Sequence, residues 1–440
     1  MKHNLTALLF ILILSGQSCI TIPNQHQGFP PGVWRGVIYI QEHQELIVTE
    51  GRKEVVTRDV EYEAKSRIIP FNFEIRYDSA SKPVMVVQND LERIVFNEIV
   101  IGRDRKTGDD TFQINLTPYD ACLKGVFEED KMRGHFIVRD KKDYAMPFEA
   151  RFGQAHRFAK IPKVSRITLA PRYQVVFADT SEARYDAIGE FRQNGQIVGG
   201  TFRTESGDFR YLEGVLEEDQ LSLSCFDGAH AYLFEAQVRG DSLIGSFYSG
   251  KHYKTSWRGV KTETGVLRPG DAILAAKPDS GPFVFGFTTP EGKSIRFDDP
   301  AIQSKVKLVQ IMGSWCPNCM DESNFIRDYL REHPDPDLYV VGLSFERYAD
   351  RAKAMSQIQK YRSRLDLPYE IAYGGMSHKD SAAAALPQLG GVKAYPTTLF
   401  IDRENRIVKV HTGFDGPATS RYQAYRNEFH QTMQQLLQHK

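Results

Sequence analysis

The chain has 440 residues, more than one hydrophobic core supports, so two or three domains are expected. Hydrophobic residues make up 41% of it and charged residues 25%, as in soluble globular proteins. Lysine plus arginine equals aspartate plus glutamate, 56 against 56, and no dense basic run occurs, which argues against a nucleic-acid-binding protein.

The first residues have the pattern of a secretory signal. Lys2 precedes an apolar run from Leu5 to Leu14, and small and polar residues follow it. The run is too short for a lasting transmembrane helix, so residues 1–18 are predicted to be a signal peptide and residues 19–30 a tether. An exported protein is therefore expected, in a compartment where disulfides persist.

Two interpretations of the cleavage point remain open. Residues 16–18 fit the small-x-small site of ordinary signal peptidase. Cys19, which follows them, also resembles the lipidated cysteine of a bacterial lipoprotein box, although Gly16 stands where leucine is usual. In the second case the mature protein is a membrane-anchored lipoprotein of the cell envelope that faces the periplasm.

Residues 31–262 have the pattern of β structure. Apolar and polar residues alternate in many short runs, as at Phe71, Phe73 and Ile75, which is typical of half-buried strands. Glycine, aspartate and asparagine separate the runs, as expected of turns. One β-rich domain is predicted here.

A motif recurs within this region, for example in residues 125–136 and, with the same spacing, in residues 236–247. Each copy predicts a hairpin with Asp or Asn in its turn. Repeated hairpins predict an antiparallel all-β barrel or sandwich. Trp34 and Trp257, each followed by Arg-Gly-Val, are expected on its first and last strands.

The pattern changes after a linker rich in Gly and Pro, residues 263–280. Residues 281–440 alternate candidate strands, such as Val306–Met312, with amphipathic segments such as the one near the C-terminus that contains Tyr425 and Phe429. This alternation predicts an α/β domain, so the whole chain is expected to be multidomain.

The motif Trp315-Cys316-Pro317-Asn318-Cys319 follows the strand candidate and opens a helical segment. At a helix N-terminus the dipole and free backbone N–H groups favour a thiolate, and two intervening residues keep the second sulfur within disulfide reach. Cys316 is therefore predicted to attack a disulfide and Cys319 to resolve the mixed disulfide. A zinc site is the alternative, but further ligands with clear spacing are missing nearby, so no metal is expected.

A second segment, Tyr395-Pro396-Thr397-Thr398, precedes another strand candidate. Together with the cysteine motif it resembles the thioredoxin superfamily, in which the proline of such a segment is cis and lies beside the active-site disulfide. The resemblance implies this place for Pro396 at the active site. The resemblance also implies a supporting role at the site for residues within or next to the two motifs, namely Trp315, Pro317, Tyr395 and Thr397.

The stretch between the two motifs narrows the resemblance. An inserted helix and strand there is similar to the exported disulfide reductases of the TlpA and ResA type, and the likeness covers about residues 281–440. The order of a lipoprotein-like signal, a β-rich region and this domain resembles chains of Bacteroidetes-type bacteria.

One position departs from thioredoxin itself. The buried Asp of thioredoxin corresponds to Gln310, which cannot accept a proton. The TlpA and ResA type carries a Glu three residues after the second cysteine, and Glu322 stands there. The resemblance implies that Glu322 takes the proton from Cys319, while a solvated acid in the first helical turn is the alternative.

Two further cysteines, Cys122 and Cys225, lie in the β region. Cys225 takes the repeat position that Phe136 and Phe247 hold elsewhere, which indicates a small core residue. A structural Cys122–Cys225 disulfide is the other interpretation in an oxidising compartment.

Three functions are compatible with the sequence. The first is reduction of protein disulfides without a cofactor, with an upstream electron donor in the envelope. The second is a thiol peroxidase of the peroxiredoxin class, but that family has Thr three residues before its reactive Cys, where Gly313 stands. The third is a surface binding protein whose β region recognises a partner; the intact Cys316, Cys319 and Pro396 argue against a vestigial redox domain.

Overall fold

The structure is a computed structural model that describes residues 28–40, 47–50, 53–56, 67–178, 184–272 and 281–438. Cys19, the predicted signal peptide and most of the predicted tether lie outside the described residues. Within the described part, no helix has the length and apolar character needed to cross a membrane. A small hairpin, β2 (Ile47–Glu50) and β3 (Lys53–Val56), stands apart from three larger sheets.

The first large sheet has nine strands in the order β6-β5-β4-β1-β11-β10-β9-β8-β7, and every pairing is antiparallel. Its strands are β1 (Gly32–Tyr39), β4 (Ile68–Tyr77), β5 (Pro83–Asn89), β6 (Glu92–Phe96), β7 (Glu98–Arg103), β8 (Asp110–Asn115), β9 (Ala121–Glu128), β10 (Lys131–Val138) and β11 (Ala145–Phe152). Asn97 alone separates β6 from β7, which end this order, so the sheet curls until its edges meet.

The second sheet follows the order β13-β12-β20-β19-β18-β17-β16-β14-β15. Its strands are β12 (Arg172–Ala178), β13 (Tyr185–Asn194), β14 (Ile197–Thr204), β15 (Gly207–Asp208), β16 (Leu212–Glu217), β17 (Gln220–Phe226), β18 (Ala231–Arg239), β19 (Ser242–Ser249) and β20 (Tyr253–Lys261). Because β13 also pairs with β14, this sheet closes into a barrel. Trp34 and Trp257 lie on β1 and β20, the first and last strands of the two sheets.

Aromatic side chains fill the inner faces of both sheets. Phe71 and Phe73 are fully buried in the first sheet, as the alternation predicts, and Phe202, Phe234 and Trp257 are buried in the second. The Phe202 and Phe234 rings stack at 4.5 Å between centroids. The cores therefore consist of large rings at alternate strand positions.

Arg157, on the connection between the two sheets, holds them together. Its guanidinium donates to the Ser224 hydroxyl at 3.2 Å and forms an ion pair with Glu213 at 3.4 Å. Its backbone carbonyl accepts from the Arg35 side chain at 3.0 Å. Arg157 is only 5% exposed, so its polar groups are buried at the junction of the sheets. Buried polar groups need hydrogen-bond partners, and both sheets supply them here.

The C-terminal region contains a seven-stranded mixed sheet in the order β22-β21-β25-β24-β23-β26-β27. Its strands are β21 (Gly286–Thr288), β22 (Ser294–Arg296), β23 (Val306–Met312), β24 (Leu338–Glu346), β25 (Glu370–Met376), β26 (Thr397–Ile401) and β27 (Ile407–Thr412). Strands β23, β24 and β25 are parallel, whereas β26 is antiparallel to β23. The short 3-10 helix η1 (Gly270–Ala272) precedes this sheet.

Helices cover both faces of this sheet. They are α2 (Pro317–Glu332), α3 (Arg351–Arg364), α4 (Lys379–Ala385) and α5 (Tyr422–Gln438). Leu308 and Met312 of β23 belong to the same buried cluster as residues of α2, α3 and α5, whereas Val309 and Ile311 belong to the cluster that includes α4. The period of two along β23 thus separates two layers of core.

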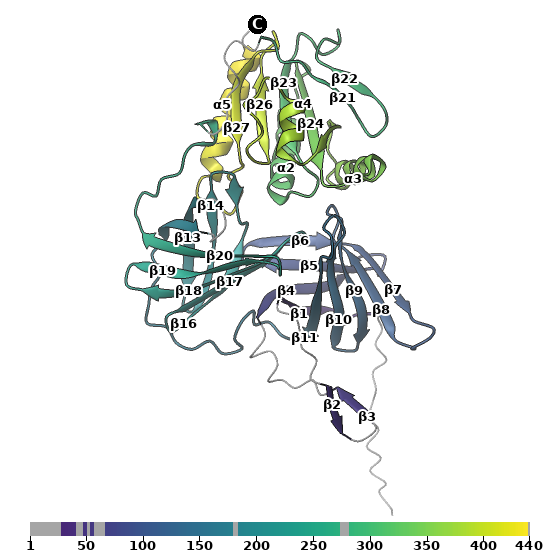
Figure 1. The fold of residues 1–440 in the computed structure, drawn as a ribbon, viewed down its shortest axis with the longest axis vertical. Helices are drawn as coiled ribbons and strands as arrows, with labels where there is room; N and C mark the ends of the chain where they lie inside the picture. The colour runs from purple at the N-terminus through teal and green to yellow at the C-terminus, as the bar shows by residue number, and fades with distance from the viewer. Residues whose placement is uncertain are drawn as a thin grey trace, which may run out of the picture.

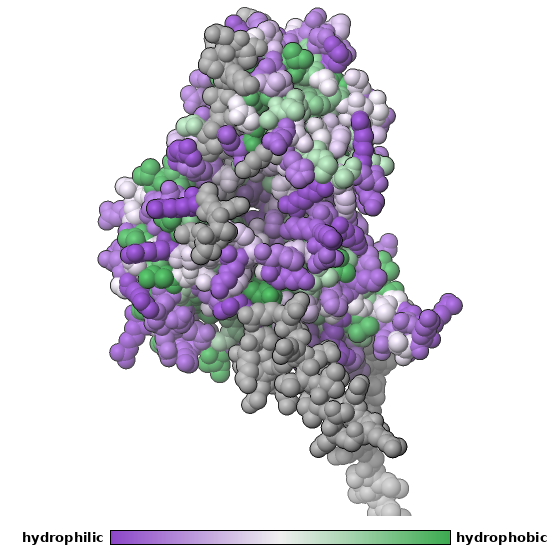
Figure 2. Space-filling view, in the orientation of Figure 1, coloured by the Kyte–Doolittle hydropathy of each residue, from purple (hydrophilic) through white to green (hydrophobic). Residues whose placement is uncertain are grey.

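The three parts pack against one another (Figure 1). The C-terminal region lies above the two β-sheets, with α2 and α3 toward the first sheet and α5 toward the second. Figure 2 shows a face on which hydrophobic residues are scattered among hydrophilic ones rather than gathered. The predicted fold class, an antiparallel all-β region followed by an α/β domain, is confirmed.

The predicted hairpins are also present, and each reverses in a two-residue turn. The pairs that flank the turns are Glu128–Lys131, Asn194–Ile197, Glu217–Gln220 and Arg239–Ser242. The glycines of the motif lie where two backbones approach closely. A Cβ atom at Gly134 would lie 2.1 Å from the carbonyl oxygen of Lys124 and 2.7 Å from the Cα of Gly125.

This close approach predicts that Gly134→Ala destabilises the protein by about 2–3 kcal/mol, because the added methyl group forces β9 and β10 apart. The control is Gly286→Ala, since the Cβ position of Gly286 has no atom within 4 Å. Denaturant unfolding of both variants measures the difference. A Gly134→Ala protein as stable as the wild type would contradict the described spacing.

Candidate active site

The loop between β23 and α2 places both cysteines of the motif at the start of the helix. Cys316 is the N-cap residue with extended backbone angles, φ −103° and ψ 114°, and Pro317 is the first helical residue. The Cys316 sulfur accepts a hydrogen bond from the Cys319 backbone N–H at 3.3 Å. Cys316 is 7% exposed and Cys319 is 0% exposed, and both thiols are free. The first sulfur therefore receives the N–H donor that stabilises a thiolate.

The second motif lies directly beside the first sulfur. The Tyr395–Pro396 peptide bond is cis, and the Cys316 thiol donates to the Tyr395 carbonyl oxygen at 3.7 Å. The Trp315 and Tyr395 rings meet edge to face at 5.6 Å between centroids. Thr397, at the start of β26, is fully buried, and its hydroxyl donates to the Ala394 carbonyl oxygen at 2.9 Å. The residues matched to the thioredoxin pattern thus form one cluster.

Glu322 is fully buried within α2 rather than solvated. Its carboxylate accepts hydrogen bonds from the Thr398 hydroxyl at 2.8 Å, the Gln310 amide at 2.9 Å and the Tyr425 hydroxyl at 3.2 Å. Burial raises the pKa of Glu322, while the Thr398 and Gln310 donors oppose this shift. A buried carboxyl held by neutral donors is suited to exchanging a proton with its surroundings.

Gln310 connects this carboxylate to the second cysteine. Its amide nitrogen donates to Glu322 and, at 3.2 Å, to the backbone carbonyl of Cys319. Its amide oxygen accepts from the Ser323 hydroxyl at 2.9 Å and the Tyr369 hydroxyl at 3.2 Å. Gln310 therefore fixes the position of Glu322, a role that its residue type did not reveal.

The second sulfur is held in its protonated form by its surroundings. Burial, followed by the neighbouring Cys316 thiol, raises the pKa of Cys319 well above its usual range. The charge of Glu322, which Gln310 links to the Cys319 backbone, raises the pKa of Cys319 further. Cys319 therefore needs a proton acceptor before it can attack another sulfur.

This part of the chain also matches a known protein family. Residues 270–425 match the Redoxin family. The C-terminal domain is a thioredoxin-like redoxin domain. This confirms the resemblance drawn from its two motifs, and its chemistry is that of a thioredoxin-like oxidoreductase.

Solved structures also match part of the chain, at low sequence identity. A thiol:disulfide interchange protein from Chlorobium tepidum is 16% identical with a TM-score of 0.27, covering 39% of this chain and 99% of its own. A secreted Mycobacterium tuberculosis disulfide oxidoreductase is 18% identical with a TM-score of 0.26, covering 34% and 96%. A thiol-disulfide oxidoreductase from Bacteroides fragilis is 14% identical with a TM-score of 0.25, covering 34% and 99%. No curated protein matches the sequence significantly.

Glu346, at the carboxyl end of β24, also belongs to the site of the redoxin domain, although the sequence did not single it out. Its carboxylate accepts from the Ser314 backbone N–H at 3.1 Å and from the Ser314 hydroxyl at 2.7 Å. Glu346 is 1% exposed, and burial raises its pKa. It anchors the loop that carries Trp315. Its position at the end of β24 could have indicated it, because β24 is parallel to β23 and the ends of parallel strands meet at one edge of a sheet.

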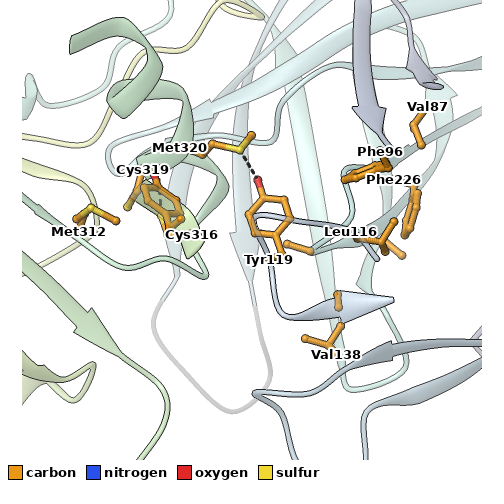
Figure 3. Packing of buried hydrophobic residues seen from close by; sticks show 14 of the residues in the cluster. Val87, Phe96, Leu116, Tyr119, Val138, Phe226, Met312, Cys316, Cys319 and Met320 are labelled. Carbon is orange, nitrogen blue, oxygen red and sulfur yellow. Dashed lines mark hydrogen bonds between the residues drawn. The ribbon is translucent and has the colours of Figure 1, made fainter. Parts of the chain in front are cut away.

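The β region supplies further neighbours of the redoxin motif that the sequence did not reveal. The Tyr119 hydroxyl donates to the Met320 sulfur at 3.4 Å (Figure 3). Arg210 donates to Asp321 at 2.8 Å. Burial raises the pKa of Asp321 to about 7 despite Arg210. Within the described residues, no group of three or more His, Cys, Asp or Glu is placed to hold a metal ion.

The structure does not contain the predicted Cys122–Cys225 bridge, since both thiols are free and buried. Cys122 lies on β9 of the first sheet, where burial raises its pKa. Cys225 lies on β17 of the second sheet within the aromatic core. The two thiols are thus in different sheets with different neighbours, and the interpretation of Cys225 as a small core residue fits this position.

The exposures predict that Cys316 is alkylated faster than Cys319 in the reduced protein, because Cys319 is fully buried and its pKa is raised. Peptide mass spectrometry after timed iodoacetamide treatment measures both rates. Cys225, another fully buried thiol, is the control for general unfolding. Faster labelling of Cys319 would reverse the roles of the two cysteines.

The buried carboxyl predicts a pH dependence. Below its raised pKa Glu322 is protonated and cannot accept a proton, so resolution by Cys319 should accelerate as pH rises through that pKa. Glu322→Gln should remove this rise and slow resolution about 10²-fold at neutral pH. Decay of a preformed mixed disulfide across the acid-to-neutral range measures it. Glu332→Gln, at an exposed position of the same helix, is the control. A Glu322→Gln profile that superimposes on the wild type's would leave Glu322 a packing role only.

Proposed function

We propose that this protein reduces disulfide bonds of protein substrates through the Cys316–Cys319 pair. The observation that carries the proposal is the Cys316 sulfur, which sits at the N-terminus of α2 with the Cys319 N–H as donor and the Pro396 segment beside it. This arrangement offers one activated sulfur and a second within reach of it.

The proposed reaction has two exchange steps. The Cys316 thiolate attacks one sulfur of the substrate disulfide, forms a mixed disulfide and releases the other substrate sulfur as a thiolate that takes up a proton. Cys319 then gives its proton to Glu322 and attacks the Cys316 sulfur. The products are the Cys316–Cys319 disulfide and the second substrate thiol, so two electrons pass from protein to substrate. A dithiol donor must then reduce the protein again.

The peroxidase alternative is less well supported. A side chain at Gly313, where peroxiredoxins carry Thr, would place its Cβ 2.4 Å from the Trp315 ring nitrogen and 2.9 Å from the Phe345 carbonyl oxygen. The Trp315 ring nitrogen donates to that same carbonyl at 2.9 Å. The loop is thus built around a glycine and leaves no room for a hydroxyl next to the reactive sulfur.

We place this reaction outside the cytosol. The apolar run from Leu5 to Leu14 and the small residues after it support export, and Cys19 supports lipid anchoring to the membrane. Protein disulfides accumulate in such compartments, and an upstream dithiol donor in the envelope would then supply the electrons. Metabolic labelling of the native protein with a fatty acid, in parallel with Cys19→Ser, tests the anchor.

The two cysteines should differ in how their loss affects turnover. Cys316→Ser should abolish insulin reduction because no nucleophile remains. Cys319→Ser should accumulate a mixed disulfide between Cys316 and the substrate, since the resolving thiol is missing. Turbidity of reduced insulin and non-reducing gels measure the two effects, with Cys122→Ala as the control outside the site. Turnover retained in Cys316→Ser would refute the proposal.

A further inference from the structure

The β region lies directly over the cysteine motif. Two of its segments make the contact: the Pro118–Tyr119 loop of the first sheet and the turn of the second sheet that contains Gly207 and Arg210. We call these four residues the cover. Figure 3 shows the Tyr119 ring reaching toward Met320, next to Cys316 and Cys319.

The first half of the cover occupies the space beside Cys316. Tyr119 is 5% exposed, and burial raises its pKa well above the usual range, with Cys316 among the charges that contribute. Tyr119 and Cys316 belong to one buried cluster, and Figure 3 shows the Tyr119 ring beside the cysteine motif. The Pro118 carbonyl accepts from the Gln357 amide of α3 at 2.6 Å, which fixes the loop on the redoxin domain.

The second half of the cover touches both residues between the cysteines. The Arg210 guanidinium donates to the Pro317 carbonyl oxygen at 3.4 Å as well as to Asp321. Gly207 lies so close to Asn318 that a Cβ atom there would be 2.1 Å from the Asn318 amide nitrogen. Pro317 and Asn318 thus each have a neighbour from the β region, and Tyr119 contacts Met320 further along the same helix.

This contact conflicts with the proposed reaction of a protein substrate. Disulfide exchange requires the attacking sulfur, the attacked sulfur and the leaving sulfur to come together, and a protein disulfide brings its own backbone with it. Cys316 is only 7% exposed under the cover. In this arrangement a folded substrate cannot reach the Cys316 sulfur.

The redoxin domain is held in place by polar contacts and by a buried hydrophobic cluster that includes Tyr119, Cys316 and Met320. Besides those of the cover, Arg364 donates to the Asn97 side chain at 2.6 Å, and Arg347 donates to Asp140 at 3.2 Å. Hydrophilic side chains also prevail where the two parts meet on the face shown in Figure 2. Interfaces between domains of one chain commonly resemble transient protein–protein contacts, and the polar pairs named here can exchange their partners for water when the two parts move apart.

We infer that the β region closes the redox site in the resting protein and that displacement of the cover is the step that admits protein disulfides. The inference rests on the proposed function, because it concerns the substrate of the same site. The cover thereby separates substrates by size: a small disulfide needs a smaller opening than a protein does.

The first experiment measures access to Cys316 without any substrate. Arg210→Ala removes the contacts with Pro317 and Asp321, and Gln357→Ala removes the contact with Pro118. In each reduced full-length variant, iodoacetamide should alkylate Cys316 about tenfold faster, while Cys225 labelling stays unchanged. The control is Arg133→Ala, a half-buried residue far from the cover that pairs with Glu128 within the first sheet.

The outcomes separate the two hypotheses. Unchanged Cys316 labelling in both variants, each shown to be folded by circular dichroism, overturns the cover. If Arg210→Ala does not fold, Gln357→Ala alone decides.

The second experiment compares substrates on the same proteins. Insulin reduction should accelerate in Arg210→Ala and Gln357→Ala more than reduction of a small aromatic disulfide does. Faster labelling without insulin reduction by any variant refutes the proposed function and leaves the cover intact. Equal insulin reduction by all variants, with unchanged labelling, refutes the cover and leaves the proposed function intact.

Discussion

Three separate parts of the chain meet at the guanidinium of Arg210. It forms ion pairs with Glu92 of the first sheet and Asp321 of α2, and its own backbone connects β15 and β16 of the second sheet. Arg210 is 4% exposed, so its charged group contacts these carboxylates instead of water. Removing one partner of such a buried pair typically costs about 3–5 kcal/mol, because the remaining charges are left without compensation. The position of both β-sheets relative to the cysteines therefore depends on this one side chain.

The same exclusion of water shapes the chemistry below the cysteines. Cys319, Glu322 and Gln310 are all fully buried. Protons in such a place move between side chains rather than to solvent, and a charged carboxylate is disfavoured unless donors surround it. Tyr425 and Thr398 supply those donors from α5 and β26, which explains why elements far from the motif in sequence belong to the site.

Local patterns in the sequence predict the parts of the structure that nearby residues determine. The hairpins follow from their turn residues and from glycines such as Gly134, and the β23–α2 junction follows from an apolar run before the cysteine motif. The clustering of Cys316 with Pro396 was predicted from a family resemblance, because the hydrophobic periodicity of strands and helices says nothing about two positions so far apart in the sequence.

Contacts between distant elements could not be predicted in this way. The bond from Arg210 to Asp321 joins positions 111 residues apart, and alternation shows that a residue is buried without showing against what. Hairpins of the same kind also build both β-sheets, so the repeat does not reveal where one sheet ends. For the same reason the spacing of Cys122 and Cys225 did not show that they lie in different sheets.

The aromatic cores of the β region determine where it can bind another molecule. Many β-barrels act as containers, with a cargo held along the axis. Here Phe177, Phe202, Phe234 and Trp257 occupy the axis of the second sheet themselves. The loops and rims of this barrel are therefore the parts that remain for contact with another molecule. A binding event at a rim that also touches α2 would be converted directly into a change in thiol reactivity.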